Sequence, residues 1–157
     1  MDVAEKIVGY IGLDSLLEHW RALGDRIVFT NGCFDILHLG HVTLLNHCAT
    51  LGDRVVVGLN SDSSVKKLKG DSRPVNNQDA RAMILASLEN VDAVIIFNED
   101  TPIELIKFFR PDVLVKGGDY KENEIVGADV VKANGGSVKI VPLVSGMSTT
   151  HLIESIK

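Results

Sequence analysis

Two histidines three positions apart follow the first strongly apolar run of the chain. The run ends at Thr30, and residues 31–41 then read NGCFDILHLGH. Taken alone, His38 and His41 fit surface imidazoles, a metal-binding pair, or two hydrogen-bond donors to phosphoryl oxygens. The zinc-helix motif needs histidines four apart with a glutamate between them, and no third ligand is evident. Gly40 carries no side chain between the two imidazoles, so a flat base or a phosphate could approach.

The same segment lacks both common phosphate-binding loops. Neither the dinucleotide pattern G-x-G-x-x-G nor the P-loop pattern G-x-x-x-x-G-K-[ST] follows the run at 26–30. Gly32 nevertheless allows the backbone to approach a ligand closely. A helix beginning near His41 would offer free N–H groups and the positive end of its dipole. These features favour an anion-binding site of another kind.

The elements that must position these residues alternate between strands and helices. Short apolar, β-branched runs predict buried strands at 27–30, 55–59, 93–97, 113–115 and 138–141. Spacing and capping signals predict helices at 14–23, 41–51, 78–89, 102–109 and 123–133. This alternation predicts an α/β fold with a doubly wound parallel sheet. Ligands bind such sheets beyond the carboxyl ends of the strands, so the loops of interest are 30–41, 60–75, 116–120 and 145–150.

The composition argues against several classes of protein. A length of 157 residues suits one domain, and a formal charge of −5 argues against a nucleic-acid-binding surface. Two cysteines cannot form a disulfide framework or a four-thiolate zinc site. The longest apolar run, at 93–97, is far shorter than the ~20 residues of a membrane span. We therefore expect a cytoplasmic protein without nucleic-acid or membrane partners.

Several motifs together resemble a known family. The stretch TNGCFDILHLGH is similar to the H-x-G-H signature of the nucleotidyltransferase superfamily, which includes the cytidylyltransferases. VGLNSDSSVKKLKGDSRPVN, LVKGGDY, ANGG and SGMSTT follow, and the set resembles the D-glycero-β-D-manno-heptose 1-phosphate adenylyltransferases from about residue 12 onward. The resemblance implies a Rossmann-like, five-stranded sheet of the nucleotidyltransferase type. It also implies a single domain over 1–157, with a leading helical segment at 1–24 and a catalytic core at 25–157.

The resemblance further implies a reaction. A heptose 1-phosphate would attack the α-phosphorus of ATP, giving ADP-heptose and pyrophosphate for lipopolysaccharide core synthesis. The attacking phosphate oxygen is already anionic at neutral pH, so the site must align and neutralise two polyanions rather than supply a base. We expect the stand-alone form, without a sugar-kinase half, acting as a homo-oligomer. Mg²⁺ is expected to accompany ATP, although no dedicated carboxylate cage is visible.

Each motif then receives a predicted role. The residues predicted to act catalytically on the reacting phosphates are His38, His41, Lys67 and Arg81. The residues predicted to bind the nucleotide are Thr30, Asn31, Gly32, Cys33, Phe34, Gly40, Asn60, Lys116, Gly117, Gly118, Asp119, Ser148, Thr149 and Thr150. The residues predicted to form a mobile clamp on the substrate phosphate are Lys66, Lys69 and Arg73.

Several of these residues also have a plainer structural interpretation. The basic run at 65–74 fits a solvated face as well as a phosphate clamp, and the glycines at 117–118 fit a simple turn. Ser148 alone would be a helix N-cap. For Cys33 a small buried residue is favoured over a covalent nucleophile, because no step requires one. For Asp35 a role in holding the loop is favoured over a role in positioning a metal.

The chain departs from the cytidylyltransferase pattern at two places. Those relatives have a lysine near the end of the helix after H-x-G-H, and Arg-Thr before the serine motif. This chain has Ala49-Thr50 and Val144-Ser145 there, which argues against a cytidine enzyme. Two alternatives stay open. One is another nucleotidyltransferase acting on glycerol 3-phosphate or on a flavin or pantetheine phosphate, and the other is a nucleotide-sensing module without turnover.

Overall fold

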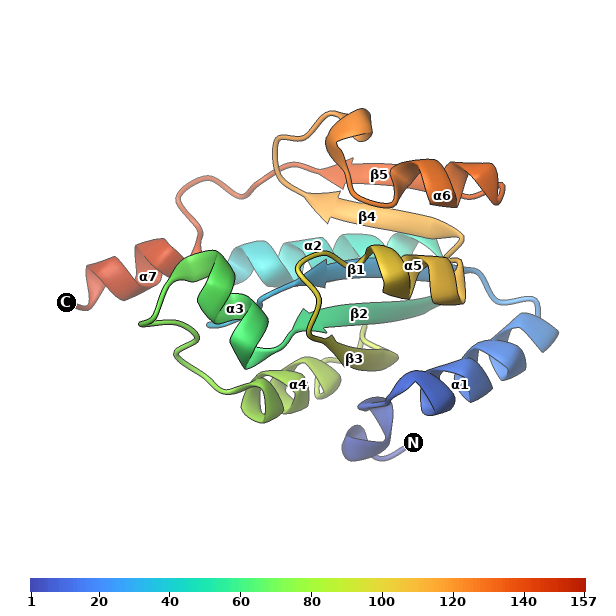
Figure 1. Ribbon diagram of the computed structural model, residues 1–157, viewed down its shortest axis with the longest axis horizontal. Coiled ribbons are helices and arrows are strands. Elements are labelled where there is room, and N and C mark those ends of the chain that lie inside the picture. The colour runs from blue at the N-terminus through green and yellow to red at the C-terminus, as the bar shows by residue number, and fades with distance from the viewer.

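A five-stranded parallel sheet forms the centre of the computed structural model, which describes residues 1–157 (Figure 1). The strands are β1 (Ile27–Gly32), β2 (Arg54–Asn60), β3 (Ala93–Phe97), β4 (Val113–Gly117) and β5 (Ser137–Val141), in the order β3-β2-β1-β4-β5. The direction of winding reverses between β1 and β4, as in doubly wound sheets. The predicted fold class is therefore confirmed.

Four of the five strands extend beyond their predicted bounds, β3 alone matching them. At the carboxyl ends the added residues are polar or glycine. Asn31 and Gly32 of β1, for example, still pair with β2. They interrupt the apolar pattern because they lie at the end of the sheet rather than in its core. Backbone pairing therefore continues past the point where hydrophobic periodicity stops.

Seven α-helices and two short 3-10 helices connect the strands. They are η1 (Val3–Lys6), α1 (Tyr10–Ala22), α2 (Leu39–Leu51), α3 (Asp62–Lys69), α4 (Gln78–Ala86), α5 (Ile103–Phe109), η2 (Glu122–Glu124), α6 (Ala128–Ala133) and α7 (Thr149–Ser155). Helix α1 begins earlier than predicted because Gly9, rather than Asp14, occupies its N-cap. Helix α6 begins later than predicted, after η2. None of the helices has the length and apolar content needed to cross a membrane.

Helix α3 lies inside the segment 60–75, which the sequence predicts as a loop. Ser61 caps the helix, since its hydroxyl accepts a hydrogen bond from Ser64 N. Val65 is its one fully buried apolar side chain. Its one other apolar residue is the exposed Leu68, so the apolar face of this eight-residue helix is too short to predict it from the sequence.

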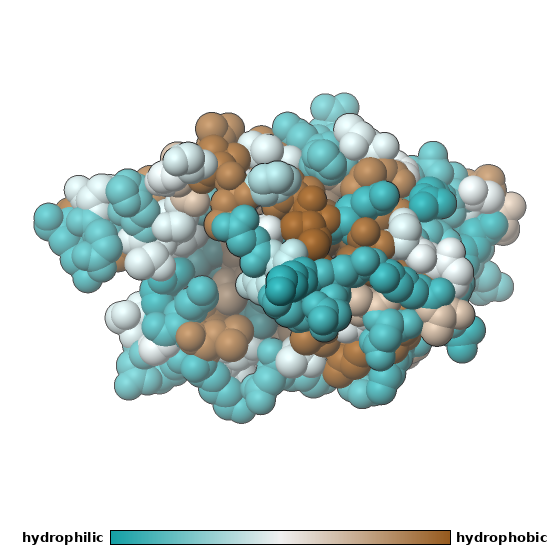
Figure 2. All heavy atoms as spheres, turned by 90° about the horizontal axis from the view of Figure 1, so that it is seen from above, coloured by the Kyte–Doolittle hydropathy of each residue, from teal (hydrophilic) through white to brown (hydrophobic).

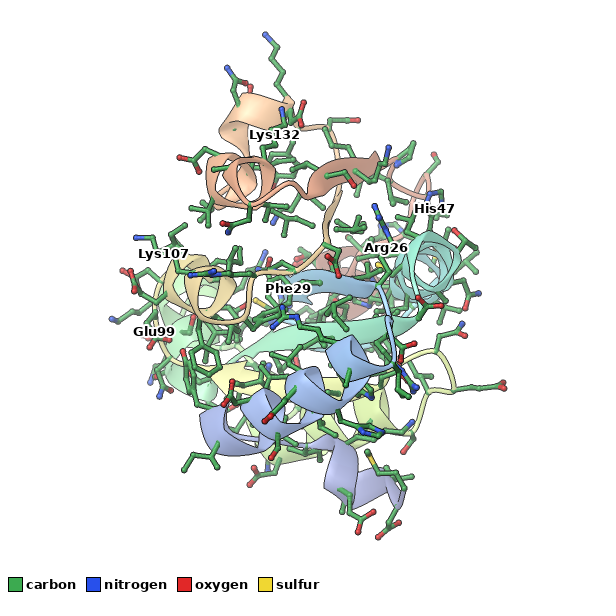
Figure 3. The ribbon with its side chains drawn as sticks, turned by 90° about the vertical axis from the view of Figure 1, so that its right-hand side faces the viewer. Arg26, Phe29, His47, Glu99, Lys107 and Lys132 are labelled. Carbon is green, nitrogen blue, oxygen red and sulfur yellow. The ribbon has the colours of Figure 1, made fainter.

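Two hydrophobic clusters cover the two faces of the sheet. Residues of each strand alternate between them, so Phe29 packs with α1, α5 and α6 while Val28 packs with α2 and α4. Phe29 meets Phe109 of α5 edge-on, with ring centroids 5.0 Å apart. Figure 3, seen from the amino ends of the strands, shows Phe29 inside the molecule on the side of α5. The leading helix α1 belongs to this packing, because Leu17 and Trp20 are buried in the same cluster.

Candidate active site

A cavity of about 650 Å³ opens at the carboxyl ends of the strands, beside the reversal point between β1 and β4. Its walls include the ends of β1, β2, β4 and β5 and the first turns of α2 and α7. In Figure 1, α3 and α7 project beyond the arrowheads of the strands, and Figure 2 shows the molecule hollowed beside this projecting end. Doubly wound sheets bind their ligands at this position.

Most of the predicted site residues meet in this cavity. Those that line it are Asn31, Gly32, Cys33, Phe34, His38, Gly40, His41, Asn60, Lys69, Arg73, Lys116, Gly117, Ser148, Thr149 and Thr150. The structure places the remaining six elsewhere, namely Thr30, Lys66, Lys67, Arg81, Gly118 and Asp119. The shared location makes one binding site geometrically possible, while the role of each residue stays a prediction.

The backbone holds both histidines in one tautomer. His38 is the N-cap of α2, where Gly40 N donates to His38 Nδ1 at 3.0 Å and His38 N donates to His41 Nδ1 at 3.3 Å. A ring nitrogen that accepts a hydrogen bond carries no proton, so a neutral ring keeps its proton on Nε2. Each imidazole is therefore left with an Nε2–H donor.

The same two rings are neutral at pH 7. They stack with centroids 3.8 Å apart, and the Phe34 ring lies 5.1 Å from that of His41. Burial lowers the pKa of His38, and burial together with the adjacent His38 ring lowers the pKa of His41 to about 4. A neutral Nε2–H can donate to a phosphoryl oxygen and stabilise negative charge that grows there.

Two glycines allow the histidine turn to close. A Cβ atom on Gly40 would lie 2.7 Å from Cε1 of His38, and one on Gly32 would lie 3.1 Å from Cε2 of Phe34. Phe34 itself has a φ of 45°, a conformation that residues other than glycine rarely adopt. Such strain is found mainly where surrounding contacts maintain it at functional sites. Gly40 thus leaves room for the His38 ring, which stacks on His41, while the approach of a base or a phosphate at this place stays a prediction.

Asp35 holds the floor of the cavity. Its side chain is fully buried and accepts hydrogen bonds from Val75 N, Asn76 N and Arg73 Nε, the last at 2.7 Å. Burial alone would raise the pKa of this carboxyl, but the hydrogen bonds and the charge of Arg73 outweigh it, so the pKa is lowered. Asp35 is thus an ionised anchor for the loop before α4, in agreement with the loop-holding interpretation.

The cations of the site come from three different segments. Arg73, whose Nε is bonded to Asp35, also contacts Thr150 of α7, with its Nη1 3.4 Å from the threonine Oγ1. Lys69 stands at the end of α3, and Lys116 at the end of β4 has a pKa lowered by burial. The Nζ atom of Lys116 lies 5.1 Å from the centroid of the Tyr120 ring. These side chains surround a space suited to a polyanion.

The start of α7 is bound to the histidine turn. Ser148 caps the helix by accepting a hydrogen bond from His151 N, and the Thr149 hydroxyl donates to Ile36 O at 3.0 Å. Thr149 is the one buried residue of this helix. The hydroxyl motif therefore has a structural role in addition to any contact with phosphate.

Arg81 does not lie where the sequence led us to expect. Its side chain is fully buried and does not line the cavity, so the predicted catalytic contact with the reacting phosphates is not possible in this arrangement. Its guanidinium instead donates to three backbone carbonyls and to Asp62. Arg81 lies on the buried face of α4 together with Ala82, Leu85 and Ala86, whereas Asp79 and Ala80 in the first turn are exposed.

The expectation for Lys66 and Lys67 also needs correction. Both are exposed, and Lys67 Nζ lies 3.8 Å from Asp100 on the surface. Successive residues of a helix point about 100° apart, so a basic run inside α3 cannot direct all its charges into one cavity. Among the three lysines of α3, Lys69 is the one that lines it.

Three predicted nucleotide-binding residues lie outside the cavity for local reasons. Thr30 is buried within β1 on the side opposite to its neighbour Asn31, and its hydroxyl has no hydrogen-bond partner. Gly118 is a buried turn residue with a φ of 126° whose N–H donates to Val141 O. Asp119 is exposed beyond that turn.

The sequence reasoning missed two loops of the cavity. Asp100, Thr101 and Pro102, after β3, and the segment 142–144, after β5, both line it. Both follow strands, so the rule that placed the other loops would have included them. Their residues carry no motif, and this is why they were overlooked.

The side chains of the site offer neither a reactive thiol nor a set of metal ligands. Burial raises the pKa of the Cys33 thiol, which argues for the inert, half-buried residue that the sequence favoured. No cluster of three or more histidine, cysteine, aspartate or glutamate side chains could hold a metal ion.

The amino-acid sequence is similar to those of known proteins. Curated proteins named bifunctional protein HldE are similar over nearly all of the chain. The protein from Hyphomonas neptunium is 56% identical over 148 residues, covering 92% of this chain and 30% of the relative. The one from Rhodopseudomonas palustris strain BisB5 is 55% identical over 154 residues, covering 98% and 31%. The chain thus spans less than a third of the length of these relatives.

Two solved structures share the fold. The crystal structure of the lipopolysaccharide core biosynthesis protein from Thermoplasma volcanium has a TM-score of 0.64 and 29% identity, covering 77% of this chain and 98% of that one. Pantoate-beta-alanine ligase from Francisella tularensis, solved with an ATP analogue and beta-alanine, has a TM-score of 0.65 and 16% identity, covering 96% and 73%. At this identity the second structure supports the fold alone.

The family match coincides with the site. A family described as cytidylyltransferase-like matches residues 29–154, a range that contains every residue lining the cavity. The chain therefore belongs to the cytidylyltransferase-like family of nucleotidyltransferases.

Proposed function

We propose that the protein is an adenylyltransferase that transfers AMP from ATP to D-glycero-β-D-manno-heptose 1-phosphate, releasing pyrophosphate and ADP-heptose. The observation that carries the proposal is the pair of neutral, stacked histidines beside three cations in one strand-end cavity. Support for the substrates comes from the motif set KGDSRPVN, VKGGDY and STT. The similarity to the proteins named HldE supports the assignment, and the solved structure of the lipopolysaccharide core biosynthesis protein supports a role of ADP-heptose in lipopolysaccharide core synthesis.

The geometry suits transfer at phosphorus without a protein base. An oxygen of the sugar phosphate attacks the α-phosphorus of ATP, and the bond from that phosphorus to the bridging oxygen breaks, so pyrophosphate leaves with the electron pair. The attacking oxygen is already anionic, and neither histidine has a free basic nitrogen because each Nδ1 accepts a backbone N–H. His38 and His41 are then placed to donate Nε2–H bonds to oxygens of the α-phosphate as charge accumulates.

The cations have a complementary task. Two polyanions must meet in one cavity, and Lys69, Arg73 and Lys116 reduce their mutual repulsion. The N-termini of α2 and α7 add backbone N–H groups at the same wall. Orientation and charge neutralisation thus account for the catalysis that this arrangement can supply.

Mg²⁺ fits this site as a companion of ATP. The chain offers no cluster of metal-ligating side chains, so the oxygens of the triphosphate would have to provide most of the ligands. When bound there, the ion would neutralise phosphate charge. We expect a chelator to abolish turnover while the melting temperature of the ligand-free protein stays unchanged.

The proposal is tested by pyrophosphate release from matched substrate pairs. ATP with heptose 1-phosphate should be turned over faster than CTP with glycerol 3-phosphate, or ATP with a flavin or pantetheine phosphate. Faster reaction with any of the other pairs would replace the proposed substrates. ATP binding without pyrophosphate release from any pair would indicate the nucleotide-sensing module instead.

Two expectations accompany the proposal. A cytoplasmic location suits an ATP-dependent enzyme whose two cysteines are both free thiols. Assembly into a homo-oligomer stays a prediction, which light scattering of the purified protein would test. Exposed apolar side chains such as Ile11 and Leu143 provide surface for such contacts.

A further inference from the structure

Arg81 is the largest fully buried side chain of the molecule, and four hydrogen bonds hold its guanidinium. Nε donates to Asn76 O at 2.9 Å, and Nη1 donates to Cys33 O at 2.8 Å and to Asn60 O at 2.7 Å. Nη2 donates to Asp62 Oδ1 at 2.8 Å. All four distances are those of strong hydrogen bonds, and they use four of the five N–H donors of the guanidinium.

The four acceptors belong to three segments of the chain, near residues 33, 60–62 and 76. Cys33 follows β1, Asn60 ends β2, Asp62 begins α3 and Asn76 precedes α4. The carbonyls of Cys33 and Asn60 are therefore the ends of two neighbouring strands, and both residues line the cavity. A single planar group thus joins the two strand ends from behind the cavity wall.

The segments that follow these two strand ends carry the predicted catalytic histidines and one cation of the cavity. The segment after Cys33 leads through the turn to His38, and the segment after Asn60 leads through α3 to Lys69. No other side chain hydrogen-bonds to backbone groups of both strand ends. The sheet pairs β1 with β2 as far as Gly32 and Leu59, and beyond that point the bonds of Arg81 are the side-chain link that sets the histidine turn relative to α3 and its cation.

Arg81 also brings a buried positive charge to the two strand ends. Its ionic partner is Asp62, whose side chain is 43% exposed, while the guanidinium itself is 0% exposed. The carbonyl oxygens of Cys33 and Asn60 each direct a lone pair to Nη1 of Arg81. Arg81 occupies those lone pairs with donors and places a positive charge behind them.

We propose that Arg81 is a positioning residue, which fixes the ends of β1 and β2 at the spacing where the histidine pair and Lys69 act on one triphosphate. It does so without touching the substrate. The proposal rests on the proposed nucleotidyl transfer and deepens it, since it assigns the alignment of the two walls to one side chain.

Arg81→Lys tests the proposal, because lysine keeps the charge but lacks the planar set of donors. The matched control is Arg54→Lys at the opposite end of β2, where Arg54 pairs with Asp25 at 2.7 Å and lies over the Trp20 ring. For Arg81→Lys we expect kcat to fall by roughly 10- to 100-fold, with KM for ATP changed by less than about threefold. The control should change neither constant.

Hydrogen exchange supplies a readout that needs no turnover. In Arg81→Lys the amides of segments 33–38 and 60–66 should exchange faster, while those of the Arg54→Lys control should not. If the wild-type protein turned over no sugar phosphate, the proposed function would fail, but this exchange measurement and calorimetric ATP binding would still test the positioning role.

Three outcomes would overturn the proposal. Wild-type kcat in Arg81→Lys would show that the bonds to the strand ends are dispensable, and unchanged exchange in both segments would show that they do not fix those segments. Equal losses in kcat and in ATP affinity would indicate direct contact with the triphosphate. If Arg81→Lys does not fold, Asp62→Asn takes its place, with an expected kcat loss of at least about threefold at unchanged KM for ATP; wild-type kcat would again overturn the idea.

Discussion

The two walls of the cavity are built in different ways. The wall at the ends of β1 and β2 rests on two buried ions, Arg81 and Asp35, whose side chains are both 0% exposed. The wall formed by the segment 142–147 and α7 consists mostly of exposed residues, and Thr149 is the one buried residue of that helix. Side-chain hydrogen bonds connect the two walls, among them the bond from Thr149 to Ile36 O and the contact of Arg73 with Thr150.

Because the first wall rests on buried ions and the second consists mostly of exposed residues, we expect the first to be preformed and the second to open more easily. Local opening costs least where few apolar contacts are buried and where hydrogen bonds are exposed. The histidine pair stands on the first wall, so its geometry is present before a ligand arrives. We expect the second wall to open more readily than the first, because hydroxyl contacts contribute much of its side-chain attachment.

The largest expected effect concerns the histidine donors of the fixed wall. His38→Asn keeps an acceptor for Gly40 N, since asparagine is also a good N-cap, but it removes the Nε2–H group. We expect a loss of roughly 10²- to 10³-fold in kcat, as for other donors that stabilise a transition state. Single-turnover kinetics with calorimetric ATP affinity measures it.

The same substitution at His41 has a matched control. His41→Asn should lose activity as His38→Asn does, whereas His41→Gln, which can place an amide N–H near the position of Nε2, should retain more. Equal activity of the Asn and Gln variants would mean that the donor at Nε2 has no part in catalysis.

The next effect tests the buried ionic anchor of the fixed wall by comparison with an exposed ion pair. Asp35→Ala leaves Arg73 and two backbone N–H groups without their buried partner, so unfolding should become easier by about 3 kcal/mol. Lys67→Ala, which breaks an exposed pair with Asp100, should cost less than about 1 kcal/mol. Urea denaturation of both variants measures the contrast, and similar costs would contradict the idea of a buried ionic anchor.

A third effect is the pH dependence of stability. The pKa of His41 is lowered from 6.5 to about 4 in the folded protein, so between these values the unfolded chain binds more protons and stability falls as the pH falls. From pH 7 to pH 5 His41 should remove about 2 kcal/mol from the free energy of unfolding. His38, whose pKa is lowered in the same direction, adds to this loss.

Denaturation curves at pH 7 and pH 5 provide the measurement. His41→Asn cannot be protonated there, so its stability should change less between the two values than that of the wild type. An identical pH dependence in both proteins would show that His41 is not held neutral by the fold.

The smallest effect concerns the movable wall. Thr149→Val removes the hydroxyl that binds Ile36 O but keeps the size of the side chain. Global stability should fall by only about 1 kcal/mol, while KM for ATP rises severalfold, because α7 is held less often against the histidine turn. Hydrogen exchange should accelerate in 148–155 and not in β1 or β2. Faster exchange in the strands would mean that both walls open together.

Much of the fold was predictable from local patterns. The five strands follow from apolar, β-branched runs, and the parallel sheet follows from their alternation with helices. The histidine turn was also accessible, since glycines and imidazoles at fixed spacing are short-range features. Helix α3 was missed because its two apolar residues, Val65 and Leu68, form too short an apolar face, and with it the direction of Lys66 and Lys67 was missed.

The remaining errors involve partners that are distant along the chain. Arg81 and Cys33 are 48 residues apart, and Arg73 and Asp35 are 38 apart. A charged side chain in the first turn of a helix reads from sequence as a surface residue or a ligand, because charged residues are rarely fully buried without a partner. The partners that make burial of Arg81 possible become visible only when the strand ends are brought together.

The amino-acid sequence by itself determined the sheet, the loops that follow its strands, and the residue types that could bind phosphate there, because each depends on neighbouring residues. Tertiary structure decided which of those residues face the cavity, that both histidines are neutral donors, and that Arg81 supports the site from behind. These properties depend on burial and on the direction of side chains, and packing between distant segments sets both.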